Sequence, residues 1–158
     1  MHSESEAKHT SMAEKPRATP WRTLRDWWNS PTGIWAAPIA WMVVIFLLSS
    51  RSDFPNLTPY KPDLQNIIGH LAEYGLLTYL WARALETSRG LRHRSWIVLV
   101  IVMLYAASDE WHQTFVPGRY GDYRDWLVDV TAAVVVLLGL RWRRRQADRD
   151  PRPAPGPR

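Results

Sequence analysis

The sequence predicts an all-α membrane protein, a four-transmembrane-helix bundle with disordered tails and with both chain ends in the cytoplasm. Three observations predict this fold: apolar runs long enough to cross a bilayer, basic residues gathered in alternate loops, and polar, proline-rich ends. The 158 residues suffice for one domain of this kind. Cysteine is absent, which excludes disulfides, a thiol nucleophile and thiolate metal sites.

The first 32 residues hold a polar tail and a short tryptophan-rich segment. Residues 1–20 contain too few apolar side chains to offset the entropy lost on ordering, so we expect a disordered cytoplasmic tail. In residues 21–32 large apolar side chains recur at helical spacing: Trp21, Leu24, Trp27 and Trp28. This segment is either an amphipathic helix on the inner membrane surface or a plain linker.

The first predicted span covers residues 33–50, an uncharged run that contains one proline, Pro38. About 17 to 25 apolar residues cross a bilayer, because each adds about 1.5 Å to a core about 30 Å thick. A cleaved signal peptide is the competing interpretation. However, the polar lead of 32 residues is too long for the charged region that opens an ordinary signal peptide. We therefore predict a signal anchor.

Three further spans complete the predicted membrane domain, which covers residues 33–140. Residues 64–85 carry a histidine and a glutamate within an apolar pattern. Residues 95–115 begin as almost pure hydrocarbon and end in polar side chains, and residues 125–140 repeat this order in reverse. The polar ends of these spans are therefore expected at the same membrane face.

The positions of lysine and arginine predict the orientation, because short basic loops resist translocation. Basic residues crowd before the first span, between the second and third spans, and after the fourth span. We place these three segments inside. The other two loops contain only two basic residues each and are placed outside; these are Arg51 with Lys61, and Arg119 with Arg124.

The net charge of +5 does not indicate a nucleic-acid partner. The basic residues lie at the edges of apolar runs and form no continuous patch, so membrane orientation explains them better. Residues 141–158 are expected to form a basic, proline-rich cytoplasmic tail, which should be disordered from residue 146 onward.

Candidate functional residues gather near the predicted outer ends of the last three spans. The candidates for catalysis are Asp109, Glu110 and His70. The candidates for binding are His70, Glu73, Tyr74, His112, Gln113, Arg119, Asp125 and Asp129. Spacings of three and four residues place His70, Glu73 and Tyr74 on one helix face, and they do the same for Asp109, His112 and Gln113.

This region contains more acids than nearby basic side chains can pair. The acids are Glu73, Asp109, Glu110, Asp125 and Asp129. An ionised carboxylate at the bilayer centre costs about 2.5 to 3.5 kcal/mol, so we expect them to face the bundle interior. With two arginines and two histidines nearby, either some acids carry a proton or a cation joins them. A purely structural role in interhelical hydrogen bonds, worth about 0.6 kcal/mol per pair, is the alternative.

A metal site is chemically allowed but weakly indicated. His70, His112 and a carboxylate have the donor types that suit zinc. Their spacing does not define a metal-binding motif, so we predict neither a metal nor a cofactor.

The loop before the last span is expected to present a guanidinium just outside the membrane. Pro117 and Gly118 predict a turn, and Arg119 follows it directly. Arg119 either clamps a phosphate or carboxylate of a ligand, or neutralises Asp125 or Glu110.

The run DEWHQTFVPGR, from Asp109 to Arg119, resembles the DE-x-x-Q-x-F-x-P-G-R pattern of the VanZ-like family of bacterial membrane proteins. The second span is similar to the family pattern in HLAEYGL, and the resemblance covers about residues 46–139. The chain departs from that pattern at two places, with Asn66 and Ile67 in place of a frequent Asp-Lys pair, and Ala132 and Ala133 near a frequent glycine. The resemblance implies four spans in a family named for a member that gives low-level teicoplanin resistance, without an established reaction.

Three hypotheses about function follow from the residues and the resemblance. The leading one is a multi-pass protein of the bacterial plasma membrane whose outer-face pocket binds a membrane lipid or lipid-linked envelope component, with a link to glycopeptide (teicoplanin) resistance. The second is a membrane-embedded enzyme acting on a lipid-linked phosphate or ester, with Asp109 or Glu110 as general acid or base. The third is a proton relay or a structural scaffold. Whether the chain is an enzyme, and its oligomeric state, stay open.

Overall fold

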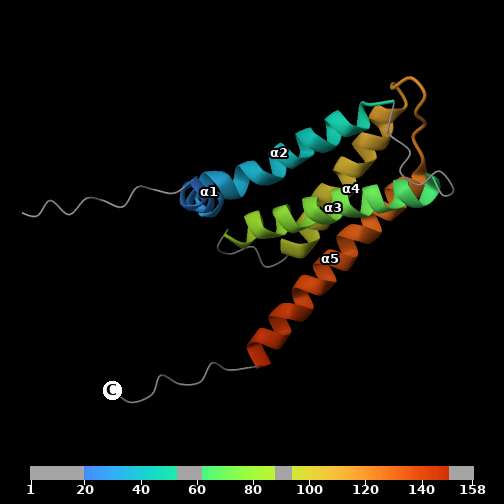
Figure 1. The fold of residues 1–158 in the computed structure, drawn as a ribbon. Helices are drawn as coiled ribbons and strands as arrows, with labels where there is room; N and C mark the ends of the chain where they lie inside the picture. Colours follow the sequence, from blue (N-terminus) through green and yellow to red (C-terminus); the bar gives the residue numbers. More distant parts are fainter. Residues whose placement is uncertain (1–19, 53–61, 88–93, 150–158) are drawn as a thin grey trace, which may run out of the picture.

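The computed structural model describes residues 20–52, 62–87 and 94–149, and the regular secondary structure in these ranges consists of helices joined by turns and loops (Figure 1). The helices are α1 (Pro20–Asn29), α2 (Pro31–Ser49), α3 (Pro62–Glu86), α4 (Arg94–Gln113) and α5 (Tyr123–Arg149). The all-α prediction is confirmed for the described part of the chain. Each of the four long helices overlaps one predicted span. Residues 1–19 of the predicted tail 1–20, and residues 150–158 of the predicted tail 141–158, lie outside the described residues, whereas Pro20 begins α1.

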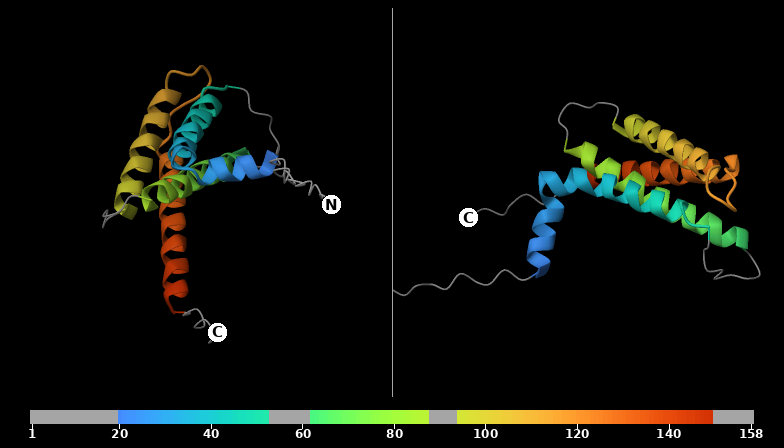
Figure 2. Two further views of the ribbon diagram at one scale, coloured as in Figure 1. Left: turned by 90° about the vertical axis from the view of Figure 1, so that its left-hand side faces the viewer. Right: turned by 90° about the horizontal axis from the view of Figure 1, so that it is seen from above.

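α1 is a helix rather than a plain linker, and a sharp junction separates it from α2. Ser30 is the N-cap of α2, because its Oγ accepts a hydrogen bond from the backbone N–H of Gly33 at 3.0 Å. Pro31 occupies the first turn, where the N–H that it lacks is not needed. A Cβ at Gly33 would lie 2.0 Å from the Trp27 carbonyl oxygen, so only glycine fits this junction. As a result α1 lies across the end of α2 (Figure 2).

α3 lies at the centre of the bundle and packs against α2, α4 and α5. Two small residues of α5, Ala132 and Ala133, are buried in the core and allow close approach of neighbouring helices. Indole and phenol groups link the helices by hydrogen bonds to backbone carbonyls. Trp41 Nε1 donates to the Glu73 oxygen at 2.9 Å, and Tyr105 OH donates to the Met42 oxygen at 2.6 Å.

The bundle buries polar side chains and exposes apolar ones. The buried polar or charged residues are Ser49, His70, Thr78, Asp109, Glu110, Gln113 and Asp129. All four long helices present large apolar side chains outward, for example Leu47 (58 % exposed), Ile68 (56 %), Leu104 (67 %) and Val135 (62 %). A water-soluble bundle distributes these groups in the opposite way, because burying apolar area stabilises it and burying charge destabilises it.

By length and composition, α2 is the one described helix that is apolar enough to cross a membrane. Only 22 % of its most apolar window is buried, whereas the core helix of a soluble protein would be mostly buried. α3, α4 and α5 do not meet the same criterion. The four predicted spans are thus helices, but hydropathy supports only the first as a span.

α5 is longer than the sequence predicted. The helix continues through Arg149, so the predicted start of disorder at residue 146 is wrong for residues 146–149. The reason is local, because arginine, glutamine and alanine are good helix formers and no proline interrupts the chain before Pro151. An ion pair between Arg144 and Glu86 also joins this extension to the end of α3.

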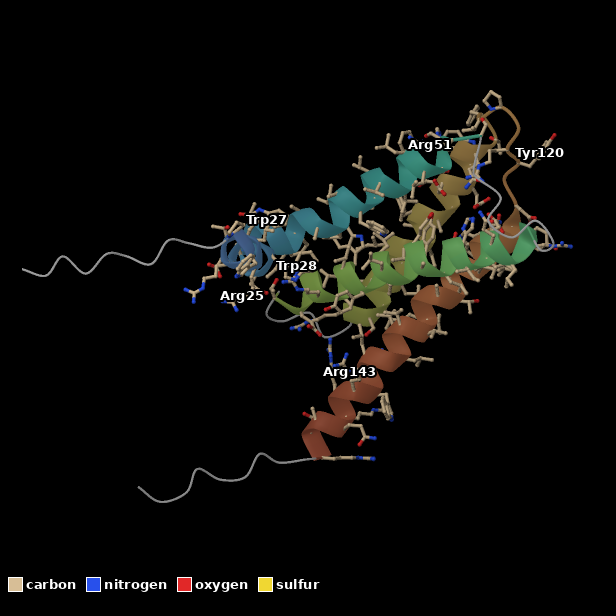
Figure 3. All side chains as sticks on the ribbon, viewed as in Figure 1. Arg25, Trp27, Trp28, Arg51, Tyr120 and Arg143 are labelled. Atoms are coloured by element: carbon tan, nitrogen blue, oxygen red, sulfur yellow. The ribbon has the colours of Figure 1, made fainter. Side chains whose placement is uncertain are left out.

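The two ends of the bundle differ in chemistry. At one end, Arg83 of α3 stacks on the ring of Trp28 at 4.4 Å and donates to the Trp28 carbonyl oxygen at 2.6 Å. Figure 3 shows Arg25, Trp27 and Trp28 gathered there, with Arg51 and Tyr120 at the opposite end. The acids and histidines predicted as functional come from the helix segments near that opposite end. The fold therefore brings the polar ends of α3, α4 and α5 together, as predicted.

Candidate functional site

A cavity of about 460 Å³ lies at this polar end, between α2, α3, α4 and the loop that precedes α5. Its lining residues are Leu48, Ser49, Ser52, Gln65, Asn66, Gly69, His70, Glu73, Asp109, Gln113, Gly118 and Arg119. Most of these side chains are polar, and Leu48 is the large apolar one among them. The cavity therefore suits a polar group rather than a hydrocarbon chain.

His70 is the centre of a buried ion-pair network between α3 and α5. Its Nδ1 lies 2.9 Å from Asp129 Oδ1, and its Nε2 lies 3.6 Å from Asp125 Oδ2. Asn66, one helical turn before His70, donates to the same Asp125 oxygen at 2.9 Å. Because Asp125 and Asp129 are one turn apart, a single imidazole reaches both carboxylates.

α4 contributes two buried acids that face different partners. Asp109 Oδ2 accepts a hydrogen bond from Gln113 Nε2 at 3.2 Å, within the same helix. Glu110 Oε2 accepts from the backbone N–H of Asp122 at 2.8 Å and thereby fastens the loop after α4 to the helix. Gly121 passes so close to α4 that a Cβ there would lie 2.6 Å from the Glu110 carbonyl oxygen. This close contact sets the position of the loop that carries Arg119.

Several buried oxygens around the cavity have no hydrogen-bond partner within the chain. They are Ser49 Oγ, Tyr74 OH, Asp109 Oδ1, Glu110 Oε1 and Asp129 Oδ2. Buried polar atoms are ordinarily satisfied, since an unpaired one costs about 1 to 3 kcal/mol. Four of these five atoms belong to residues predicted as functional. The site is therefore rich in acceptors that a proton, water or cation can satisfy.

The predicted residues fall into three groups. Five of them line the cavity: His70, Glu73, Asp109, Gln113 and Arg119. Four others lie around His70 or against it: Tyr74, whose ring stacks on His70, and Glu110, Asp125 and Asp129. The last residue, His112, does not line the cavity and faces α2. Its ring packs on Phe46 at 4.4 Å, and its Nε2 lies 3.0 Å from Ser50 Oγ.

Sequence reasoning did not single out several cavity residues as functional. Asn66 was treated only as a departure from the family pattern, although its position four residues before His70 places it on the same helix face. Ser52 lies beyond α2 and donates to the Pro117 carbonyl oxygen at 2.7 Å, which joins α2 to the loop. Gly69 lines the cavity because it lacks a side chain, and a Cβ there would touch nothing within 4 Å.

Comparison with known proteins gives one match, to a family model. The model is described as VanZ/LLP1, and it matches residues 4–144. This range includes every residue of the cavity and of the His70 network. No curated protein and no solved structure matches the chain.

Proposed function

The chain belongs to the VanZ/LLP1 family, and on that premise we propose that it is a multi-pass membrane protein of the bacterial plasma membrane that binds an amphiphilic envelope component in its polar cavity. Membership makes it a VanZ-type envelope protein, and the resemblance predicted from the DEWHQTFVPGR run is confirmed. The number of spans, the ligand and the link to teicoplanin resistance are the proposal.

The distribution of side chains carries the proposal of four spans. Charged groups lower the hydropathy of α3 and α4, but His70, Asp109 and Glu110 are buried and so would not meet lipid. The outward faces of the same helices carry large apolar side chains. A bilayer stabilises this arrangement, because it solvates apolar faces and excludes charge unless the charge is buried and paired.

Because the chain lacks cysteine, its orientation can be tested with single introduced thiols. Tyr120 is 88 % exposed on the loop after α4, and Arg143 is exposed on α5 at the basic end of the molecule. We expect a membrane-impermeant maleimide to label Tyr120→Cys in intact cells. It should label Arg143→Cys only after the membrane is permeabilised. The opposite labelling pattern would remove the proposed outer-face pocket.

The chemistry of the cavity favours the head group of an amphiphile. Its volume of about 460 Å³ lies within the range of about 300–1,000 Å³ that is typical of ligand pockets. Arg119 offers positive charge, and Glu73 and Asp109 offer hydrogen-bond acceptors. The cavity therefore matches a head group that carries both a phosphate and hydroxyl or amine groups. The apolar outer surface beside the cavity, which includes Leu64 and Ile68, would accommodate the lipid chain.

Filling the cavity is expected to abolish binding without unfolding the chain. Gly69→Trp places an indole in the cavity, since nothing lies within 4 Å of a Cβ at this position. Gly139→Trp on α5 is the matched control, because Gly139 is equally open but exposed and away from the cavity. We expect wild type to copurify with an envelope lipid, and Gly69→Trp to lose both this lipid and any protection of a sensitive host against teicoplanin.

Three outcomes separate the alternatives. Gly69→Trp that retains lipid and phenotype would contradict the pocket. Gly139→Trp that loses both would show that a tryptophan disturbs the bundle in general. If the wild type releases a cleaved product from labelled envelope lipids and Glu110→Gln does not, the protein is an enzyme and not only a lipid-binding protein.

A further inference from the structure

Three buried side chains with metal-binding donor atoms come together beside the cavity, one from each of α3, α4 and α5. They are His70, Glu110 and Asp129, and their potential ligand atoms lie within 4.8 Å of one another. Residues from three different helices form this group, so it does not follow from any local sequence motif. It also differs from the pair of histidines weighed in the sequence, because His112 lies against α2 instead.

Two unpartnered oxygens belong to this group. Asp129 is fully buried, and its Oδ2 has no hydrogen-bond partner within the chain. Glu110 is 8 % exposed, and its Oε1 also has no hydrogen-bond partner within the chain. In each carboxylate the other oxygen is already used, by His70 in Asp129 and by the Asp122 N–H in Glu110. One oxygen of each acid is therefore available to a ligand, and Glu110 is also held by a hydrogen bond that metal binding would leave intact. Buried acceptors of this kind are costly unless something binds them.

The electrostatics of the group favour a cation. Asp129 is within electrostatic range of the buried acids Glu110 and Asp109 as well as of His70. Close like charges repel strongly where water is excluded. A divalent cation would lower this repulsion and satisfy both unpartnered oxygens at once.

We propose that His70, Glu110 and Asp129 bind one divalent transition-metal ion, with zinc as the expected class. One imidazole and two carboxylates are donors that suit zinc, whereas magnesium and calcium prefer oxygen ligands alone. Tetrahedral ligands at about 2.1 Å from an ion are separated by about 3.4 Å, so adjustments of about an ångström would complete the site. Three protein ligands leave a fourth position for water or a ligand.

The surroundings supply the outer contacts that metal ligands usually have. Asp125 Oδ2 lies 3.6 Å from the Nε2 of His70 and is itself held by Asn66. His70 would bind the ion through Nδ1, which would exchange its present contact with Asp129 for the metal, while Nε2 stays toward Asp125. A carboxylate near the second ring nitrogen orients a metal-bound imidazole and increases its basicity. The backbone N–H of Asp122 holds Glu110 in the same way.

Metal titration of the full-length chain in nanodiscs tests this proposal. The protein is purified without a polyhistidine tag, stripped with EDTA, and titrated with zinc, manganese or magnesium. We expect about one zinc per chain by elemental analysis and a rise in thermal stability that EDTA reverses. Magnesium should give no such rise. His70→Ala and Asp129→Asn should each weaken zinc binding about tenfold or more, and Asp125→Asn by about tenfold.

His112→Ala is the matched control, since this histidine lies near the cavity but outside the group. It should bind zinc as the wild type does. X-ray absorption of the zinc-loaded wild type should show one imidazole with oxygen ligands, a measurement that needs no variant to fold. The proposal is overturned if wild type binds no zinc, if His70→Ala binds it equally well, or if the spectrum shows several imidazoles. It is also overturned if His2→Gln/His9→Gln removes all binding.

Discussion

Asp129→Ala is expected to lower the free energy of unfolding by about 3 kcal/mol or more. Asp129 is fully buried, and its Oδ1 lies 2.9 Å from His70 Nδ1. Removing one partner of a buried ion pair costs about 3 to 5 kcal/mol, because the remaining charge is left uncompensated. An ordinary interhelical hydrogen bond in a membrane protein averages only about 0.6 kcal/mol. Reversible unfolding in mixed micelles, followed by circular dichroism with EDTA present, measures the difference.

Thr131→Ala on the same helix is the control for this prediction. Its hydroxyl is exposed and donates to the Leu127 carbonyl oxygen within α5 at 2.7 Å, so its removal should change stability by about 0.5 kcal/mol or less. A double-mutant cycle with His70→Gln and Asp129→Asn then isolates the pair. A coupling energy well above 0.6 kcal/mol, toward the upper end of the usual range of about 0.5 to 3 kcal/mol, is expected. If the effects of His70→Gln and Asp129→Asn on stability are additive, the two side chains do not stabilise the bundle as a pair.

The positions of the long helices and of the polar end could be predicted from the sequence because both depend on local pattern. Apolar runs specify where helices form, and spacings of three and four residues specify which side chains share a face. These rules placed His70 with Tyr74, and Asp125 with Asp129, on common faces, and the structure shows each pair there. The same rules also place Asn66 on the face of His70, although Asn66 was not predicted as functional.

Partner choice across helices could not be predicted, because it depends on how each helix is rotated about its axis. His112 shares a spacing of three with Asp109, but that spacing is about 60° short of a full turn, which is enough to turn the ring toward Phe46 of α2. The same lack of rotational information left open which acid His70 pairs with. The contact of Gly121 with α4 could not be predicted either, because it depends on the path of a loop between two helices.

Gly121→Ala adds only one methyl group but is expected to lower both stability and lipid binding. A Cβ at this position would lie 2.6 Å from the backbone oxygen of Glu110, and backbone atoms cannot move aside as a flexible side chain can. The loop must therefore shift, which breaks the 2.8 Å hydrogen bond from Asp122 N–H to Glu110 and displaces Arg119. Overpacking of this kind costs about 1 to 3 kcal/mol. Lipid binding should fall together with stability.

Alanine substitutions at two other glycines serve as controls for Gly121→Ala, because they distinguish the effect of a steric clash from that of backbone strain. Gly118 has φ of 79° with nothing within 4 Å of a Cβ, so Gly118→Ala meets only the strain of a left-handed conformation, about 1 to 2 kcal/mol. Gly139 meets neither obstacle, and within a helix its change to alanine should be neutral or stabilising by up to about 1 kcal/mol. Because Gly118→Ala keeps the contact with α4, it should retain more lipid than Gly121→Ala at equal loss of stability. Equal lipid loss in both would mean that strain in the loop, and not its packing on Glu110, positions Arg119.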